Sequence, residues 1–67
     1  MSDLGNLQTV RESLVAKRRD LAHRGSMSPA DGGRSATLIR NIQLEIEALD
    51  AAMVDERALA SAVSAAA

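Results

Sequence analysis

Apolar residues recur at heptad spacing along residues 38–63 and predict one long amphipathic helix. Seven of the eight seam positions in this pattern are apolar, and Glu56 is the exception. Residues three and four apart share one face of an α-helix, so this stripe must pack against another surface. The predicted seam comprises Ile39, Ile42, Ile46, Leu49 and Met53, and it continues through Glu56 and Ala60 to Val63.

A narrower apolar stripe predicts a first helix over residues 4–24. Its seam comprises Leu7, Leu14 and Leu21. The adjacent line, Val10, Lys17 and Arg24, turns polar after its first member. Cations in the last two turns favour the negative end of the helix dipole. We expect Gly25 to end this helix, because glycine is the usual residue just past a helix C-terminus.

The segment that follows, residues 25–34, is the only turn-like part of the chain. Ser28 before Pro29, with an acid at Asp31, is typical of a helix start. Two glycines come next, and each costs about 1 kcal/mol relative to alanine in a helix interior. We therefore expect a short helical turn that begins at Pro29, with the main helix starting shortly afterwards.

These patterns predict an all-α fold: a single domain over residues 1–67 that forms an antiparallel two-helix hairpin with a longer second helix. The expected parts are helix 1 at 4–24, a loop at 25–34, helix 2 at 35–63 and an Ala-rich tail at 64–67. At 1.5 Å per residue, residues 36–63 of the second helix span about 40 Å and residues 7–24 of the first about 27 Å. We therefore expect residues 38–53 to close the hairpin, and residues 54–63 to meet another chain.

Composition makes a stable lone hairpin difficult. The chain has no cysteine and no aromatic residue, and its large aliphatics are eight Leu, three Ile and four Val. Burying each such side chain contributes about 1.5–3 kcal/mol, which barely offsets an ordering cost of roughly 1–2 kcal/mol per backbone residue. Small domains of this kind usually depend on oligomerisation or another support. We expect stabilisation by copies of itself or by docking on a larger partner.

A second face of the long helix is also low in charge. Small side chains there would let another helix approach closely, whereas a helix with one partner normally carries charged residues on its far side. The predicted protein interface comprises Leu44, Ala51, Val54, Ala58, Leu59, Ala62 and Val63. An alanine-rich surface that reflects compositional bias alone is the more common alternative.

Glu56 occupies the one polar seam position of the long helix. If the seam is closed there, its carboxylate needs a cation, and Arg11 on the antiparallel helix is the expected partner. A polar seam position of this kind can fix register or partner choice. The alternative is that the hairpin has ended by this point and leaves Glu56 in water.

Basic residues gather near the loop. Residues 1–40 carry seven Arg or Lys and four acids, whereas residues 41–67 carry one Arg and five acids. The candidates for phosphate contact are Arg18, Arg19, Arg24 and Arg34. Such a tip could bind nucleic acid weakly and in a salt-dependent way. No aromatic residue is available for base stacking and the net charge is −1, so we favour a solvated helix end with local ion pairs.

No pattern indicates catalysis. His23 is the only histidine, and no neighbouring residue would orient it as a base. The carboxylates lack the Glu-x-x-His pairing of di-metal bundles, and the glycines lack the context of a phosphate-binding loop. We therefore expect no enzyme activity, no catalytic residue, no cofactor and no metal.

The sequence thus predicts a small structural or interaction protein within a larger assembly, such as a phage particle or a bacterial complex. A nucleic-acid-binding regulator and a small inhibitor that docks on another protein are the alternatives. The chain has no apolar run of 18 residues and no secretory signal, so we expect no membrane insertion. The expected location is the cytoplasm, or the virion if a phage encodes the chain.

Overall fold

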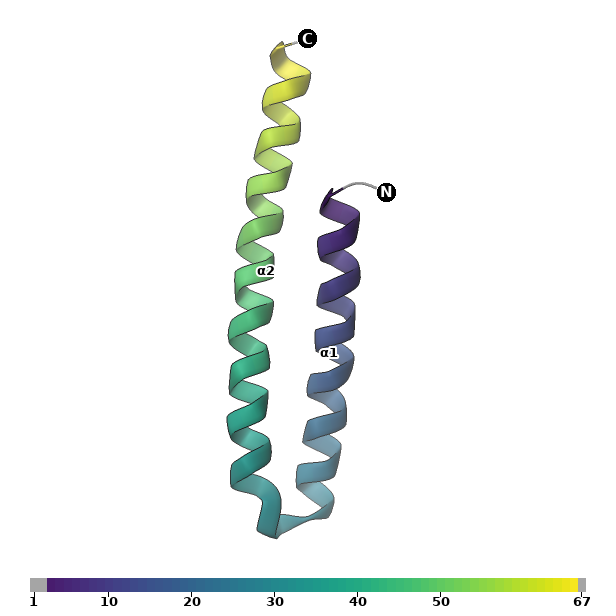
Figure 1. Ribbon diagram of the computed structural model, residues 1–67, viewed down its shortest axis with the longest axis vertical. Helices are drawn as coiled ribbons and strands as arrows, with labels where there is room; N and C mark the ends of the chain where they lie inside the picture. The colour runs from purple at the N-terminus through teal and green to yellow at the C-terminus, as the bar shows by residue number, and fades with distance from the viewer. Residues whose placement is uncertain (1–2, 67) are drawn as a thin grey trace.

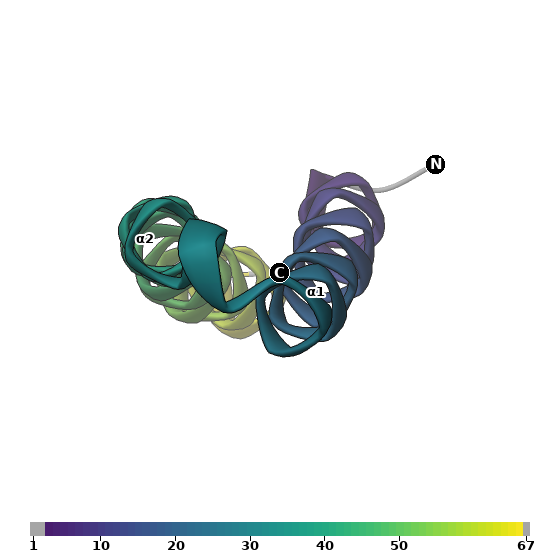
Figure 2. The same ribbon diagram turned by 90° about the horizontal axis from the view of Figure 1, so that it is seen from below.

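The computed structural model describes residues 3–66 as two antiparallel helices joined by a short turn (Figure 1). Helix α1 spans Asp3–Met27, the 3-10 turn η1 spans Pro29–Asp31, and helix α2 spans Gly32–Ala66. The two long helices lie side by side when viewed from the turn (Figure 2). The prediction of an all-α hairpin with a longer second helix is confirmed.

The turn contains Ser28, Pro29 and Asp31, the residues from which it was predicted. Pro29 opens η1, and the Asp31 amide donates a hydrogen bond to the Ser28 carbonyl oxygen at 2.9 Å. The Ser28 hydroxyl also donates to Oδ2 of Asp31 at 3.1 Å. Gly32 then takes right-handed helical angles, φ −55° and ψ −43°, so α2 begins there, three residues before the predicted start. The short helical turn at Pro29 is confirmed.

Gly25 does not end the first helix. Helix α1 continues through it to Met27, and no glycine in the described part of the chain has a positive φ. A Cβ atom at Gly25 would lie 3.0 Å from the Cβ of Ser35, and Ser35 is only 9% exposed. The missing side chain therefore allows α1 and α2 to approach closely beside the turn, which is a packing role rather than a capping role.

The core is small and lies along the predicted seam of α2. Ile42, Ile46 and Met53 are its buried apolar side chains within residues 3–66, and Ile46 is the most buried at 1% exposed. The other seam residues named from the sequence are half-buried: Leu7, Leu14, Leu21, Ile39 and Leu49. Beyond them Glu56 is also half-buried, whereas Ala60 and Val63 are exposed. Burial along the seam thus ends at Glu56.

The second seam line of α1 differs from the one expected. The line that faces α2 holds Leu4, Arg11, Arg18 and Gly25, and all four are half-buried. Val10 is 48% exposed, and Lys17 and Arg24 are exposed as well. Arg11 and Arg18 fit the seam because α2 places polar partners opposite them. A charged residue of α1 can therefore face the other helix.

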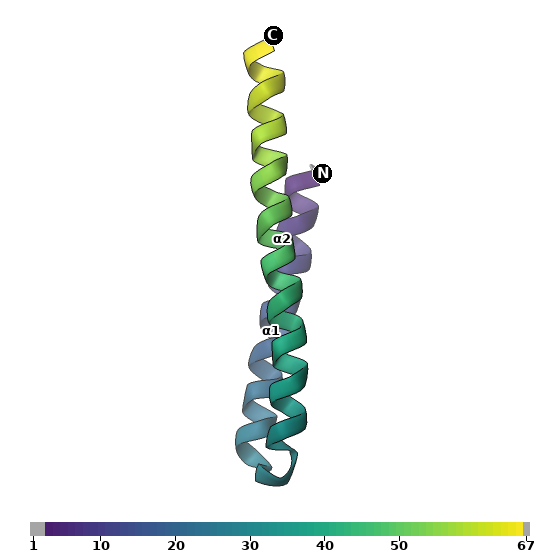
Figure 3. The ribbon, with the colours of Figure 1, turned by 90° about the vertical axis from the view of Figure 1, so that its left-hand side faces the viewer.

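The hairpin is a rod rather than a globule. Its extents are 57 × 18 × 10 Å, and its radius of gyration is 16.2 Å, whereas a compact domain of this length has a radius of about 11 Å. Helix α2 runs on past the start of α1, as the side view shows (Figure 3). No helix in residues 3–66 is both long and apolar enough to cross a membrane.

Candidate protein interface

Three contacts between the helices fix their register. Gly25 lies against Ser35, Arg18 bonds to Gln43, and Arg11 bonds to Asp50. The residue numbers in each pair add up to 60 or 61, so Asp3, the first described residue of α1, lies level with residues 57–58 of α2. The last turns of α2, residues 58–66, therefore have no described part of α1 beside them. We call this segment the overhang.

A groove forms at the step where α1 begins and α2 continues. Its apolar wall combines the first turn of α1 with the overhang, and charged side chains stand at its rim. The step groove is lined by Asp3, Leu4, Glu56, Arg57, Leu59, Ala60, Ser61 and Val63. Leu59 is 59% exposed and Val63 is 71% exposed, so both present most of their apolar surface to solvent. Exposed aliphatics grouped beside a polar rim are typical of a protein-binding surface.

The seven interface residues named from the sequence do not share one surface. Leu59 and Val63 line the step groove, whereas Val54 lies with Arg11 and Asp50 on a different side of the hairpin. The remaining four are exposed at seven- or four-residue spacing on the outward side of α2: Leu44, Ala51, Ala58 and Ala62. Leu4 was missed as a groove residue, because only the helix register shows that it lies beside the overhang.

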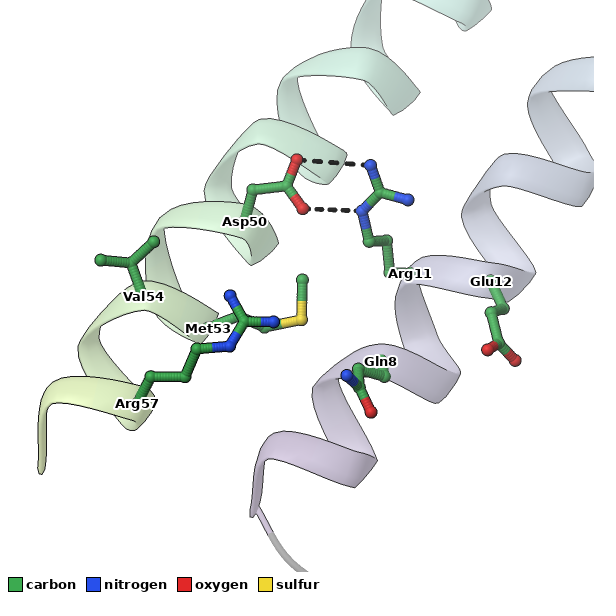
Figure 4. A pocket seen from close by; sticks show the side chains of 7 residues that line it. All are labelled: Gln8, Arg11, Glu12, Asp50, Met53, Val54 and Arg57. Atoms are coloured by element: carbon green, nitrogen blue, oxygen red, sulfur yellow. Dashed lines mark hydrogen bonds and ion pairs between the residues drawn. The ribbon is translucent and has the colours of Figure 1, made fainter. Parts of the chain in front are cut away.

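On one broad side of the hairpin, polar side chains of α1 bond to polar side chains of α2. Arg11 Nε donates to Oδ1 of Asp50 at 2.6 Å, and its Nη2 donates to Oδ2 at 3.4 Å. Figure 4 shows these two side chains reaching toward each other between the helices. The hydrogen bond to Asp50, followed by the charge of that carboxylate, raises the pKa of Arg11 above its ordinary value. Farther along, Arg18 Nη1 donates to Oε1 of Gln43 at 2.7 Å.

Glu56 is not the partner of Arg11. The ion pair of Arg11 is with Asp50, at 2.6 Å, because the register puts Arg11 level with residues 49–50. Glu56 lies about two turns farther along α2, half-buried at the rim of the step groove. Its carboxylate therefore borders the opening of the groove rather than a closed seam.

Two of the four arginines proposed to contact phosphate form contacts within the chain. Arg18 bonds to Gln43, and Arg24 Nη2 lies 2.8 Å from Oδ2 of Asp20. Arg19 and Arg34 are exposed, and Asp31 lines the same hollow beside the turn as Arg24 and Arg34. Phosphate binding by this tip stays a prediction.

The described residues contain no group of three or more His, Asp or Glu side chains placed to hold a metal ion. His23 is exposed near the end of α1, and the Ser26 hydroxyl donates a hydrogen bond to the backbone carbonyl oxygen of His23 rather than to its ring. Within residues 3–66 no buried side-chain nitrogen or oxygen lacks a hydrogen-bond partner.

Comparison with known proteins adds no relative. No protein-family model matches the chain, and no curated protein or solved structure does either. The exposed surfaces of the hairpin are therefore the features that indicate its function.

Proposed function

We propose that this chain is a small non-enzymatic interaction protein, a subunit of a larger assembly that docks through the overhang and the step groove. The observation that carries the proposal is the continuation of α2 past α1. It leaves Leu59 and Val63 exposed next to Leu4, at a place where no described part of the chain covers them.

The surface of the whole chain supports the same proposal. The hairpin exposes 5000 Å², whereas a compact monomer of 7.0 kDa exposes about 4,000 Å². Its buried core within residues 3–66 consists of Ile42, Ile46 and Met53. A rod with so little buried apolar surface gains stability when a partner covers its sides. A phage particle or a bacterial complex is the kind of assembly that we propose for it.

The mass of the purified chain in solution, measured with its circular dichroism over a concentration series, tests this proposal. We expect the helical signal and the mass to rise together with concentration, or the helix to form only when a partner is added, because association stabilises the folded state by mass action. A folded monomer whose helical signal and unfolding midpoint do not depend on concentration would contradict the proposal.

The overhang is tested by Val63→Asp. At a concentration where the chain is fully helical, this change should leave the helical signal unchanged while weakening assembly about ten-fold or more, because a charge placed in an apolar interface must be desolvated. Ala65→Asp is the matched control, since it adds the same charge two residues later on the opposite side of the helix. Equal losses of assembly in the two variants would argue against docking through the groove side of the overhang.

A further inference from the structure

Charge is divided between the two ends of the hairpin. Residues 17–40, which we call the turn end, hold six Arg or Lys and two Asp, a net charge of +4. The rest of the chain holds two Arg and seven Asp or Glu, a net charge of −5. The turn stands alone at its end of the molecule, whereas α1 begins and α2 ends toward the other end (Figure 1). The rod is therefore positive at the turn and negative at the open end.

The positive charges surround the turn end rather than line one side of it. Arg24 and Arg34 border one hollow beside the turn. Arg19 stands five residues before Arg24, and Arg40 stands six residues after Arg34. At about 100° per residue, both intervals lead to other sides of the helices. All four side chains are exposed, and we call this set the arginine collar.

The two aspartates of the turn end already have partners within the chain. Oδ2 of Asp20 lies 2.8 Å from Nη2 of Arg24, and Oδ2 of Asp31 accepts a hydrogen bond from the Ser28 hydroxyl. Glu45, the first acid of α2, lies beyond the collar. Three members of the collar form no ion pair with another residue in the range 3–66: Arg19, Arg34 and Arg40. The collar is thus free to meet an external anion.

The apex of the turn end is apolar. Met27 is 73% exposed, more than any other large apolar side chain in residues 3–66, and Pro29 and Ala30 beside it are exposed as well. At 1.5 Å per residue, Arg24 and Arg34 lie within about 6 Å of this apex along the rod, and the whole collar lies within about 15 Å. An apolar apex is therefore followed at once by a ring of cations.

A flat anionic lipid surface fits this arrangement better than a nucleic acid does. The major groove of a DNA duplex is about 12 Å wide and admits one helix, whereas the hairpin is 18 Å across. Single strands are usually held by stacking on aromatic rings, and the chain has none. A lipid surface met end-on lies close to every side of the collar, and its interfacial layer accepts apolar side chains such as Met27.

We propose that the turn end docks on an anionic lipid surface, with Met27 among the headgroups and the arginine collar around it. Guanidinium groups then pair with phosphate and carboxylate groups of the lipids. The negative open end turns away from the surface, and a rod 57 Å long holds the overhang far from the lipids. The turn end and the step groove are separate surfaces, so this proposal does not depend on docking through the overhang.

Cosedimentation with vesicles tests the electrostatic contact. The full chain should bind vesicles that contain about 30% phosphatidylserine but not vesicles of phosphatidylcholine alone, and raising the salt from about 0.1 M to 1 M should release it. Arg34→Gln should weaken binding about five-fold, which is the usual contribution of one cation near an anionic surface. Arg57→Gln, the matched control at the open end, should leave binding unchanged. Equal binding to the two kinds of vesicle, or equal affinities of the two variants, would overturn the proposal.

The apolar apex is tested in the same assay. Met27→Ser should weaken binding about ten-fold, because the interface no longer takes up an apolar side chain. Val54→Ser changes a side chain that is 61% exposed in the other half of the rod, and it should have no effect. Asp31→Asn should strengthen binding about five-fold, since it removes an anion near the apex. A Met27 variant that binds like the unchanged chain would overturn the docking of the apex.

An environment-sensitive fluorophore tests the orientation, and the absence of cysteine allows single labels. A nitrobenzoxadiazole label at Ala30→Cys should brighten and shift to the blue when anionic vesicles are added, because it enters a less polar layer. The same label at Ala62→Cys on the overhang should not change. Equal changes at the two sites, or a larger change at residue 62, would show that the rod does not stand on its turn end and would overturn the proposal.

A DNA duplex of mixed sequence is the competing polyanion. If the chain bound the duplex at lower concentration than the anionic vesicles, the lipid surface would be overturned as the partner. A chain that binds no vesicle at low salt has the same consequence. These failures leave the proposed assembly subunit intact, because its test depends on Val63 and on association of the chain in the absence of lipid.

Discussion

At the scale of single residues, Gly25 shows how one missing side chain sets the spacing of the two helices. A Cβ atom there would stand 3.0 Å from the Cβ and 3.1 Å from the Oγ of Ser35. Gly33 is also helical, but a Cβ atom on it would meet nothing within 4 Å. The same residue type therefore has opposite consequences at two positions eight residues apart.

Alanine substitution separates these two glycines. Gly33→Ala should stabilise the hairpin by about 0.4–1 kcal/mol, because alanine restricts the unfolded chain and favours the helix. Gly25→Ala gains the same helix propensity but must push α1 away from Ser35, so we expect a net loss of stability. Denaturant unfolding at one protein concentration measures both. An equal gain in the two variants would show that α1 can move without cost.

Arg11 and Arg18 are the residues that sequence patterns alone misplace. They lie on the face of α1 that contacts α2, whereas the sequence pattern suggested Glu56 as the partner of Arg11 and phosphate as a contact of Arg18. Their burial depends on Asp50 and Gln43, which are about 40 and 25 residues away. A pattern within one helix cannot report partners on another helix. The register, and with it the step groove, could therefore not be predicted from the sequence.

At the scale of elements, α2 has a sharply defined inner side. Ile46 is 1% exposed, whereas Leu44, two residues earlier, is 54% exposed. This contrast follows from the 3.6-residue period, which places residues two apart on roughly opposite sides of a helix. Burial on the inner side joins α2 to α1, whereas the outer side is exposed.

Aspartate at these two positions tests that division. Ile46→Asp should unfold the hairpin, because it places an unpaired charge in the most buried site of a small core. Leu44→Asp should lower the free energy of unfolding by less than about 1 kcal/mol. The side chain it replaces is mostly exposed, so the main loss comes from the lower helix propensity of aspartate. Helical signal and thermal unfolding report both. Similar losses would mean that Leu44 is covered in the folded species.

The two helices and the short turn could be predicted from local sequence patterns. The heptad spacing of Ile39, Ile42 and Ile46 indicated the long helix, and Ser28 before Pro29 indicated the short turn. The helix ends could not be placed as well. Gly25 resembles a helix terminus in the sequence, and only the packed structure shows that it lies inside α1 and leaves room for Ser35.

At the scale of the whole molecule, unequal helix lengths give the hairpin a paired part and an unpaired part. Helix α1 has 25 residues and α2 has 35. Because burial along the seam ends at Glu56, the paired part contains the core and the overhang contributes little to it. Stability and docking are then located in different parts of one rod.

Removal of seven residues from either end tests this separation. A chain that stops after Ala60 keeps Leu59 but loses most of the overhang. Its thermal midpoint should fall by less than about 3 °C at matched concentration, because residues 61–66 have no described part of α1 beside them. A chain that starts at Gln8 loses Leu4 and Leu7, which are both half-buried against α2. Its stability should fall by about 2 kcal/mol or more.

Thermal unfolding followed by circular dichroism compares the two truncations directly, because equal numbers of residues are removed. The shorter C-terminus should also abolish the docking that Val63 supports. If the C-terminal truncation lowered the midpoint as much as the N-terminal one, the overhang would be holding the hairpin together, and α2 would act as one structural unit along its whole length. Retained stability with lost docking instead assigns the last turns of α2 to a partner.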